Sequence, residues 1–414
     1  MSSSRKKVAV IGGGAAGMLC AGMAARGGCD VTLFEKKNAV GRKIAITGKG
    51  RCNVTNDCDK NTFIENVPTN PRFLYAAYSA FSSQDTMAFF EENGVKLKVE
   101  RGNRVFPESD KAFDIVDALR AFCLKNKVNI IYEKVTEITT ESGRITGVKT
   151  DKKAYAFDNA VIATGGVSYP LTGSDGDGYK FAKAMGHKII QPKPSLVPVE
   201  TKESFVKELM GLSLKNVSVS VFDNAKNKEV FSDFGEMLFT HFGLSGPIIL
   251  SASCHMKPME KNRYTVSIDL KPALDEKTLD NRLLSEFSKA QNKNFSNVLA
   301  TLLPQKLIPV FARLVGIPES KKVNVITKAE RQDIIRLLKD FRCTVSAFRP
   351  IEEAIVTSGG VDTKEINPKT MESKIISGLY FAGEVIDVDA YTGGFNLQIA
   401  FSTANLAALA ICSE

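Results

Sequence analysis

Three glycines near the start of the chain, Gly12, Gly14 and Gly17, stand at the spacing G-x-G-x-x-G. The first permits a tight turn, the second lets the backbone approach a pyrophosphate, and the third lets a helix pack close to a sheet. Glu35 follows 23 positions after Gly12, where its carboxylate can accept hydrogen bonds from both ribose hydroxyls of an adenosine. Together these residues predict a site for a dinucleotide.

The elements that position these residues follow from the hydropathy pattern. Val8–Ile11 is a short apolar run typical of a buried parallel strand, and Asp30–Phe34 is a second strand that leads to Glu35. Between them lies a helix of small residues, whose N-terminus offers free N–H groups and a partial positive charge to phosphates. A glycine-rich turn in an ordinary α/β protein is the alternative, but it leaves Glu35 unexplained.

A second group of residues with binding chemistry lies near the C-terminus. The strand Leu379–Phe381 leads to Gly383 and Glu384, and Glu384 or Asp387 could accept hydrogen bonds from hydroxyls of a ribityl chain. A helix that starts after Gly394 would direct its N-terminus at a flavin ring and stabilise negative charge on the reduced form. With the first motif in the same chain, this pattern predicts FAD.

A few side chains are candidates for proton or electron chemistry. His241, Tyr169 and Tyr391 could each donate a proton to a substrate, with a purely structural role as the alternative. Cys52 could form a covalent link to flavin or act as a redox thiol. No resolving cysteine is near Cys52 in the sequence, so a small side chain beneath a non-covalently bound cofactor is favoured. No metal site is predicted.

The character of the sequence changes twice along the chain. Residues 1–190 are expected to form the first part of a FAD-binding domain, and residues 351–414 its second part. Residues 191–350 begin in a proline cluster and are expected to form an inserted substrate domain, strand-rich at first and then helical. The remaining expectations are a long glycine-rich loop over 36–56, amphipathic helices over 71–93 and 110–126, a β-meander over 128–157, a return to the sheet at 354–360 and a terminal helix over 399–410.

Composition limits the class of protein and its compartment. The 414 residues are 43% hydrophobic and 24% charged, which is ordinary for a soluble protein of two or three domains. Val8–Ala25 is uncharged but interrupted by glycines, so it is not interpreted as a membrane span or signal peptide, and no other span is expected. Eight scattered cysteines fit reduced thiols in the cytoplasm.

The net charge and the absence of a second dinucleotide-binding motif limit the partners that the sequence predicts. The net charge of +9 is spread along the chain without a long basic run, which is more typical of a solvated surface than of a nucleic-acid interface, although it would favour anionic substrates. The chain has no second G-x-G-x-x-G and therefore no dedicated NAD(P)H module. Either NAD(P)H visits the flavin transiently as electron donor, or O₂ is the electron partner.

Several longer motifs resemble one known family nearly from end to end: Gly48–Asn56, Arg104–Pro107, Gly165–Tyr179, Gly235–Pro247 and Gly383–Gln398. They are similar to the YhiN/BaiN-type FAD-dependent oxidoreductases. The resemblance implies an α/β, two-dinucleotide-binding Rossmann-like FAD domain interrupted by an inserted domain of a β-barrel plus helices. Members include 3-dehydro-bile-acid Δ4,6-reductases and aminoacetone oxidases, so the family does not fix the substrate.

The resemblance also implies a set of FAD contacts, position by position. Two of them, Arg42 and Arg51, have independent support, because guanidinium groups suit diphosphate oxygens, with a solvated surface charge as the alternative. The implied contacts are Gly12, Gly14, Ala16, Gly17, Glu35, Lys36, Gly41, Arg42, Arg51, Asn53, Val135, Ala163, Thr164, Gly165, Gly383, Glu384, Asp387, Asn396, Leu397 and Gln398.

We therefore expect a cytoplasmic FAD-dependent oxidoreductase that transfers a hydride between flavin N5 and a small organic substrate. NAD(P)H-dependent reduction of an enone, such as a 3-oxo-Δ4 bile acid or steroid, is favoured over O₂-dependent oxidation of an amine or aminoketone. A tRNA-modifying flavoprotein is less favoured, because neither a clustered basic face nor catalytic cysteines are found. Accordingly, no nucleic-acid or membrane partner is expected, and the oligomeric state is left open.

Overall fold

The structure is a computed structural model that describes residues 5–413. The chain folds as two compact units, one formed by the residues up to Ser195 together with those from Pro350 onward, and the other by Leu196–Arg349. Each unit has its own apolar core, and neither core draws residues from the other unit. The boundaries lie within a few residues of the expected segments 1–190, 191–350 and 351–414.

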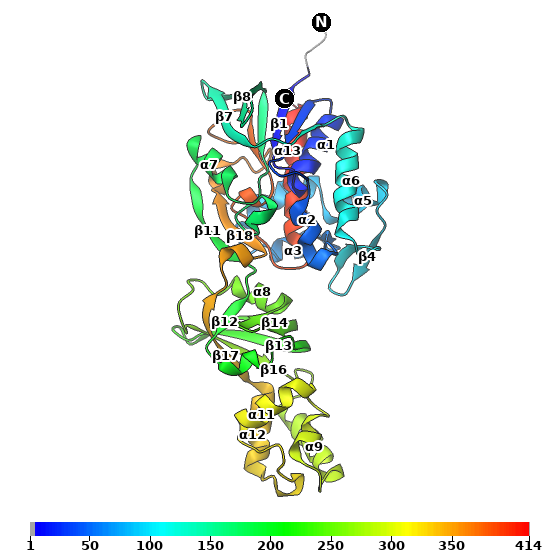
Figure 1. Ribbon diagram of the computed structural model, residues 1–414, viewed down its shortest axis with the longest axis vertical. Coiled ribbons are helices and arrows are strands. Elements are labelled where there is room, and N and C mark those ends of the chain that lie inside the picture. The colour runs from blue at the N-terminus through cyan, green and yellow to red at the C-terminus, as the bar shows by residue number, and fades with distance from the viewer. Residues whose placement is uncertain (1–4, 414) are drawn as a thin grey trace. The chain divides into compact units, whose positions relative to one another are not determined.

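A five-stranded parallel sheet with the order β19-β10-β1-β2-β6 forms the centre of the first unit; Figure 1 labels its middle strand, β1. Its strands are short and largely buried, so they consist mainly of Val, Ile, Leu, Phe and Ala. This sheet and its helices confirm the α/β, Rossmann-like fold. The strands are β1 (Lys7–Ile11), β2 (Asp30–Phe34), β6 (Asn129–Ile131), β10 (Asn159–Ile162) and β19 (Leu379–Phe381).

Helices of the first unit pack around this sheet. In α1 and α13 small residues let the two helices lie against each other, and their facing residues are buried. The helices are α1 (Ala15–Arg26), α2 (Arg42–Ile46), α3 (Lys60–Glu65), α4 (Tyr75–Ala80), α5 (Ser83–Glu92), α6 (Ala112–Lys125), α7 (Asp177–Ala184) and α13 (Phe395–Ser413).

Three small antiparallel sheets complete the first unit. The expected meander over 128–157 is present only as β7-β8-β9, because its first expected strand, β6, pairs in parallel with β2 in the central sheet. The expected return to the central sheet at 354–360 is wrong, because β18 pairs with β11 in a separate two-stranded ribbon. The strands are β3 (Thr55–Asn56), β4 (Leu97–Glu100), β5 (Arg104–Pro107), β7 (Val135–Glu141), β8 (Arg144–Thr150), β9 (Ala154–Ala156), β11 (Ile189–Ser195) and β18 (Val356–Val361).

Other boundaries differ from expectation for identifiable reasons. The expected loop over 36–56 contains α2 and β3. The expected helix over 71–93 is interrupted, because Ser82 and Asp85 form a capping box in which the Ser82 N–H donates to the Asp85 carboxylate at 2.7 Å and a new helix starts. The terminal helix starts at Phe395, directly after Gly394 as expected, and is longer at both ends than the expected span 399–410.

The second unit is a closed six-stranded barrel followed by helices, which confirms the inserted barrel-plus-helices organisation (Figure 1). Along β13, Val217, Val219 and Val221 alternate into the barrel core. The strands, in barrel order, are β12 (Val199–Thr201), β15 (Gly243–Ser245), β14 (Lys228–Phe239), β13 (Ser213–Asp223), β16 (Tyr264–Asp269) and β17 (Phe341–Phe348). The helices are α8 (Pro247–Ser253), α9 (Glu276–Lys289), α10 (Phe295–Leu299), α11 (Ile308–Val315) and α12 (Lys328–Lys339).

The helix α13 is long and apolar enough to cross a membrane by length and composition, which corrects the expectation that no segment is. It is nevertheless 67% buried within its own unit over the apolar window. Its polar side chains are also bonded inside the protein: the Gln398 amide donates to Ser402, and the Thr403 hydroxyl donates to the Ile399 carbonyl. This is the packing of a core helix.

Candidate cofactor site

The turn between β1 and α1 requires glycine at two of its three motif positions. Gly12 has φ +108°, and a Cβ atom there would lie 2.6 Å from the Ala163 carbonyl oxygen. A Cβ atom at Gly17 would lie 1.8 Å from the Gly12 carbonyl oxygen. Both contacts are shorter than any real Cβ contact, so the close approach of α1 and β10 to this turn depends on these two glycines.

Gly14 is different, because a Cβ atom there would meet no protein atom within 4 Å. It is the N-cap of α1, it makes no side-chain capping bond, and the first turn of α1 carries no acidic residue. The N-terminus of a twelve-residue helix therefore faces open space with its N–H groups and partial positive charge available. The sequence places the pyrophosphate of the dinucleotide in this space, and that contact stays a prediction.

Glu35 lies beside this turn and is nearly fully buried. One carboxylate oxygen accepts the Gly13 N–H at 2.8 Å, and the other accepts the Lys37 N–H at 2.8 Å. Burial raises the pKa of the carboxyl above its ordinary value, while these two backbone donors oppose that rise. Each oxygen keeps a further lone pair, so the carboxylate can still accept hydrogen bonds from two ribose hydroxyls.

The two halves of the FAD domain meet at the start of α1. Gly383 follows β19 with φ +75°, and a Cβ atom there would lie 2.9 Å from the Cβ atom of Ala16. On the neighbouring strand, Ala163 lies against Gly12, and Thr164 and Gly165 follow it. Gly41, also at positive φ, donates its N–H to the Gly13 carbonyl at 2.8 Å. Motifs that are far apart in sequence therefore line one site.

Glu384 is held by a group of partners that the sequence did not indicate. Its carboxylate accepts from the Lys43 ammonium at 2.7 Å and from the Thr357 N–H at 2.8 Å, and the Ser168 hydroxyl is 3.2 Å away. Lys43 also donates to Ser168 at 2.6 Å. Lys43 is thus a positioning residue for Glu384, and its place beside Arg42 in the basic loop is the signal that could have identified it.

Asp387 and Asn396 shape the backbone before α13. Asp387 is buried, and burial together with the charge of Asp389 raises the pKa of its carboxyl; Asn70 donates to that carboxylate at 2.9 Å. The Asn396 amide accepts the Ala390 N–H at 2.9 Å and donates to the Ala390 carbonyl at 2.7 Å. Both side chains fix the turn that leads to the helix N-terminus.

Gln398 has protein partners on both ends of its amide. The oxygen accepts hydroxyl protons from Thr55 at 2.6 Å and Thr86 at 2.8 Å. The nitrogen donates to the Phe81 carbonyl at 2.9 Å. Its side chain therefore anchors α13 to β3 and α5, and its contact with FAD stays a prediction. Leu397, in the same helical turn, is half-buried.

Gly394 is also required by packing. It has φ +102°, and a Cβ atom there would lie 2.3 Å from the backbone carbonyl of Thr55. Asn56 donates to the Gly393 carbonyl at 3.1 Å. These contacts hold the loop around Arg51–Asn53 next to the N-terminus of α13, where the sequence places the flavin ring.

Three cationic side chains among the predicted FAD contacts, Lys36, Arg42 and Arg51, already have partners within the protein. Lys36 is paired with Asp175 and with Asp177, the latter at 2.9 Å. Lys134 is 3.9 Å from the same Asp177; the neighbouring Val135 is buried, and its contact with FAD stays a prediction. Arg42 is exposed and donates to Asn38 at 2.9 Å.

Arg51 is held by the β4–β5 ribbon. It donates to Glu100 at 2.5 Å and to Asp110 at 2.6 Å, and its guanidinium lies 4.2 Å from the centre of the Phe106 ring. Two carboxylates therefore already compensate its charge. A diphosphate contact by Arg51 would require exchange of one of them and stays a prediction.

Cys52 is fully buried, and desolvation raises the pKa of its thiol to about 12. A thiol that stays protonated at neutral pH is a poor nucleophile, so the structure favours a packing role over a covalent or redox one. All eight cysteines are free thiols.

Acid precipitation is therefore expected to release all flavin from the protein, because no protein thiol in the site is activated for covalent attachment. The measurement is flavin absorbance of the supernatant against the pellet, with Cys52→Ser as the matched variant that should behave identically. Flavin that stays in the wild-type pellet but not in the Cys52→Ser pellet would overturn this expectation.

A test of fit to FAD comes from buried polar atoms that have no hydrogen-bond partner. Within residues 5–413 three of these belong to the motif segments, Asn53 Oδ1, Tyr179 Oη and Asp389 Oδ1, and a fourth, Thr164 Oγ1, directly precedes one. Buried polar groups are normally satisfied, so such a group in and around one site indicates a polar ligand. Asn53 and Thr164 are expected contacts. Tyr179 and Asp389 were missed, although both lie in motifs that carry the family resemblance.

The structure leaves the proton-donor candidates on separate segments. Tyr169 precedes a short 3₁₀ helix, and burial raises the pKa of its hydroxyl above the ordinary value. The Tyr391 N–H donates to the Asn66 carbonyl at 3.0 Å. His241 is exposed in the turn between β14 and β15 of the second unit. Their catalytic roles stay predictions.

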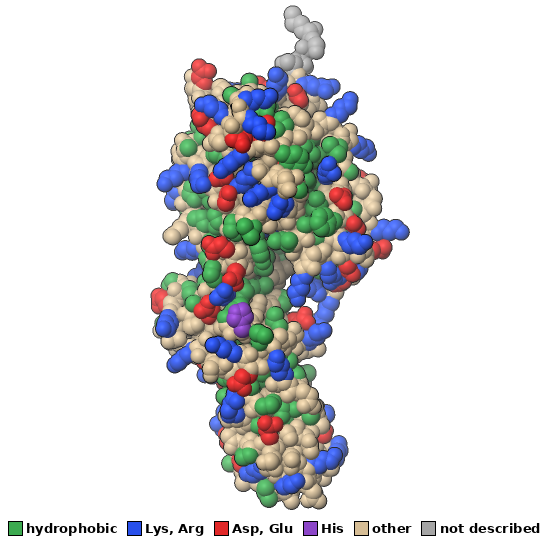
Figure 2. Space-filling view, viewed as in Figure 1, with side chains coloured by type: hydrophobic (Ala, Val, Ile, Leu, Met, Phe, Trp, Pro, Cys, Tyr) green, Lys and Arg blue, Asp and Glu red, His purple; other side chains and the backbone are tan. Residues whose placement is uncertain are grey.

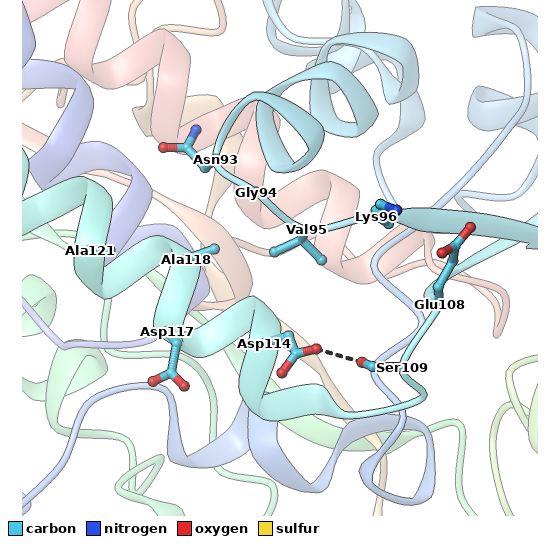
Figure 3. A pocket seen from close by; sticks show the side chains of 10 residues that line it. All are labelled: Asn93, Gly94, Val95, Lys96, Glu108, Ser109, Asp114, Asp117, Ala118 and Ala121. Carbon is cyan, nitrogen blue, oxygen red and sulfur yellow. Dashed lines mark hydrogen bonds between the residues drawn. The ribbon is translucent and has the colours of Figure 1, made fainter.

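A surface hollow of about 480 Å³ lies elsewhere on the first unit, between α6 and the loop after α5 (Figure 3). Figure 3 shows Ala118 on α6 opposite Val95, with Asp114 hydrogen-bonded to Ser109 at the edge of the hollow. No predicted cofactor contact lines it. Its carboxylates are unsuited to a diphosphate, so this hollow is separate from the candidate site.

Comparison with known proteins agrees with this geometry. Residues 6–410 match the family described as HI0933-like protein Rossmann domain. The chain is 35% identical to "Ribosomal RNA dihydrouridine synthase" of Escherichia coli (strain K12), over 95% of each protein. It is 30% identical to "3-dehydro-bile acid delta(4,6)-reductase" of Clostridium scindens, over 97% of this chain and 98% of that protein.

The fold is shared with the structure of 3-ketosteroid-delta4-(5alpha)-dehydrogenase from Rhodococcus jostii RHA1 in complex with 4-androstene-3,17-dione. That likeness has a TM-score of 0.55 at 14% sequence identity and covers 100% of this chain and 99% of the other, so it concerns the fold alone. The family match extends over nearly the whole chain, and it is consistent with the glycine turn, the open space in front of α1 and the buried Glu35. The chain belongs to the HI0933-like Rossmann family, the YhiN/BaiN-type flavoproteins, and is a FAD-dependent oxidoreductase.

Proposed function

We propose that this protein reduces a carbon–carbon double bond conjugated to a carbonyl, and that its substrate is a uracil base within RNA. In uracil the C5=C6 bond is conjugated to the C4 carbonyl, so it has the same electron-poor character as an enone. One hydride and one proton add across that bond and give 5,6-dihydrouracil, while NAD(P)H becomes NAD(P)⁺. Bound FAD supplies the centre that accepts the hydride from NAD(P)H and passes it on.

The observation that carries the proposal is the 35% identity over 95% of both chains to a protein named as a ribosomal RNA dihydrouridine synthase. It combines with a site whose glycine turn, buried Glu35 and helix N-termini fit FAD. The proposal departs from the sequence-based expectation that excluded nucleic acid as a partner.

The distribution of charge along the chain supports RNA as the substrate. Residues 196–349 contain 23 Lys and Arg against 17 Asp and Glu, whereas the rest of the chain contains 32 against 29. Two thirds of the net charge of +9 is therefore in the inserted unit, which has only about a third of the residues. Excess positive charge on one unit is the electrostatic signature of binding to a polyanion.

A 3-oxo-Δ4 steroid or bile acid is the second candidate, because its C4=C5 bond is conjugated to the C3 carbonyl and needs the same chemistry. A specific observation favours it: the 30% identity over 97% of the chain to the bile-acid reductase. For either substrate a protein group must hold the proton that the hydride does not bring. Tyr169, Tyr391 and His241 are the proposed donors, and for Tyr169 burial raises the pKa of the hydroxyl further above its ordinary value.

Anaerobic stopped-flow mixing distinguishes these substrates. Photoreduced enzyme is mixed with a uridine-containing ribosomal RNA transcript, with the same transcript in which cytidine replaces uridine, with a 3-oxo-Δ4 steroid, or with air-saturated buffer. We expect fast return of oxidised flavin absorbance with the uridine transcript only, and a gain of two hydrogens in a uridine nucleoside by mass spectrometry. Acceleration by the steroid alone would favour the second candidate, and rapid reoxidation by air alone would favour the amine or aminoketone oxidase.

A further inference from the structure

The positive charge of the inserted unit is concentrated in one stretch. Residues 289–328 contain seven Lys and Arg and a single acidic residue, Glu319. Three of the seven already have partners in the protein: Lys306 donates to the Met210 carbonyl, Arg313 pairs with Glu208, and Lys321 pairs with Glu330. The other four are exposed and have no acidic partner in the described chain: Lys289, Lys293, Lys322 and Lys328. We call these four lysines the basic end.

Backbone hydrogen bonds bring the basic end together in space. The Val323 N–H donates to the Lys293 carbonyl at 3.1 Å, and the Phe295 N–H donates to the Lys321 carbonyl at 2.8 Å. The Lys322 ammonium also donates to the Asn294 amide oxygen at 2.9 Å. The turn after α9 and the segment before α12 therefore lie side by side, each with its lysines exposed.

The helices place this surface away from the barrel within the second unit. The ammonium of Lys339, in the last turn of α12, donates to the Leu274 carbonyl just before α9 at 2.8 Å, while Arg331 donates to Asp280 at 2.6 Å. The two helices are thus antiparallel, and the end of α9 lies beside the start of α12. Figure 1 shows both helices running away from the barrel strands to this end.

The chemistry of the surface points to phosphates and not to bases. The only aromatic residues between 289 and 328 are Phe295 and Phe311, and both are fully buried, so no ring is available for base stacking. Exposed amides of Gln291, Asn292 and Asn324 stand among the lysines and can donate to phosphate oxygens or to ribose hydroxyls. Figure 2 shows, by contrast, Lys and Arg interspersed with acidic side chains over much of the visible face.

We propose that the basic end is a docking surface for the sugar–phosphate backbone of RNA, bound without sequence preference. This inference rests on the proposed RNA substrate and identifies a surface, separate from the flavin-binding motifs in sequence, that would hold the polymer. Because it carries no base readout, choice of the target uridine must come from other contacts. Binding at the basic end should therefore be strongly salt-dependent.

The test compares two variants of equal charge in the FAD-loaded full-length protein. One carries Lys→Gln at the four lysines of the basic end; the control carries Lys→Gln at four exposed lysines of the first unit without acidic partners: Lys111, Lys125, Lys183 and Lys369. Fluorescence anisotropy measures binding of an oligouridylate and of an RNA hairpin without the target sequence. For the basic-end variant we expect Kd to rise about tenfold or more on both RNAs, with the slope of log K against log salt reduced by about 3.

Each other outcome has a defined meaning. An equal loss in the control variant, or no RNA binding by the wild type, would overturn the docking surface. Capture of the wild type by phosphatidylglycerol vesicles but not by RNA, lost in the basic-end variant, would overturn it in favour of a membrane. If the basic-end variant alone loses RNA binding while the wild type reduces no uridine, the docking surface stands and the proposed function fails.

Discussion

Gly14→Val is expected to give a folded protein that purifies without flavin. A side chain at this position meets no protein atom within 4 Å and its φ of −82° suits any residue, so the apoprotein can accommodate valine. The same side chain would occupy the space in front of α1 where the pyrophosphate must lie. Overfilling a packed contact costs about 1–3 kcal/mol, which corresponds to about a 5- to 150-fold loss of affinity for FAD.

Three further variants make this result specific. Gly14→Ala should show a smaller loss, because its side chain fills less of the space. Gly235→Ala in the barrel is the matched control, since a Cβ atom there makes only an ordinary contact of 3.7 Å with Ile248. Gly17→Ala should instead lower thermal stability, because its Cβ atom would lie 1.8 Å from the Gly12 carbonyl oxygen. The readouts are flavin absorbance per protein and the thermal unfolding midpoint.

Glu35→Ala combined with Gly14→Val should yield apoprotein under all conditions. Glu35→Ala removes the acceptor of the Gly13 N–H and the two lone pairs available to a ribose. Full flavin content in the double variant would mean that the N-terminal glycine turn does not bind the cofactor. Loss of circular dichroism together with flavin would instead show that the two changes act on the fold.

The parts of the site that could be predicted from sequence are those whose reasons are local. The roles of Gly12, Gly17 and Glu35 depend on one β–α–β unit, and the structure shows the backbone contacts that make each of them necessary. Ser82 and Asp85 form a capping box, which is a local sequence pattern, so the break in the expected helix could also have been predicted from the sequence.

What could not be predicted depends on partners distant in sequence. Lys43 meets Glu384 across 341 positions, and Gln398 is anchored by Thr55 and Thr86. The pairing of β18 with β11 is another long-range contact that hydropathy does not specify. The basic end was missed for a different reason: a search for consecutive lysines overlooks four lysines dispersed over 40 positions, which the fold places at one end of the helices.

Removal of the inserted unit is expected to leave FAD binding largely intact and to abolish turnover. Every FAD motif that was inferred from the sequence lies outside 196–349, and the core of the first unit contains no residue from that range. The chain leaves and returns through paired strands: β11 lies antiparallel to β18, with Ser195 opposite Val356. The Ser195 hydroxyl also donates to the buried Asp389 carboxylate at 2.6 Å, so the last residue before the deleted unit stays anchored in the first unit.

The test joins Ser195 to Pro350 through a short Gly/Ser linker and measures flavin content, thermal unfolding and reduction of the RNA substrate. A matched control inserts the same linker at both junctions while keeping residues 196–349, so that damage at the junctions can be separated from loss of the unit. Since the deletion removes His241 and the basic end together, we expect turnover below detection with flavin content close to that of the control. A folded core that loses its flavin would show that the inserted unit itself helps to bind the cofactor, and the separation of cofactor binding from substrate binding would then be wrong.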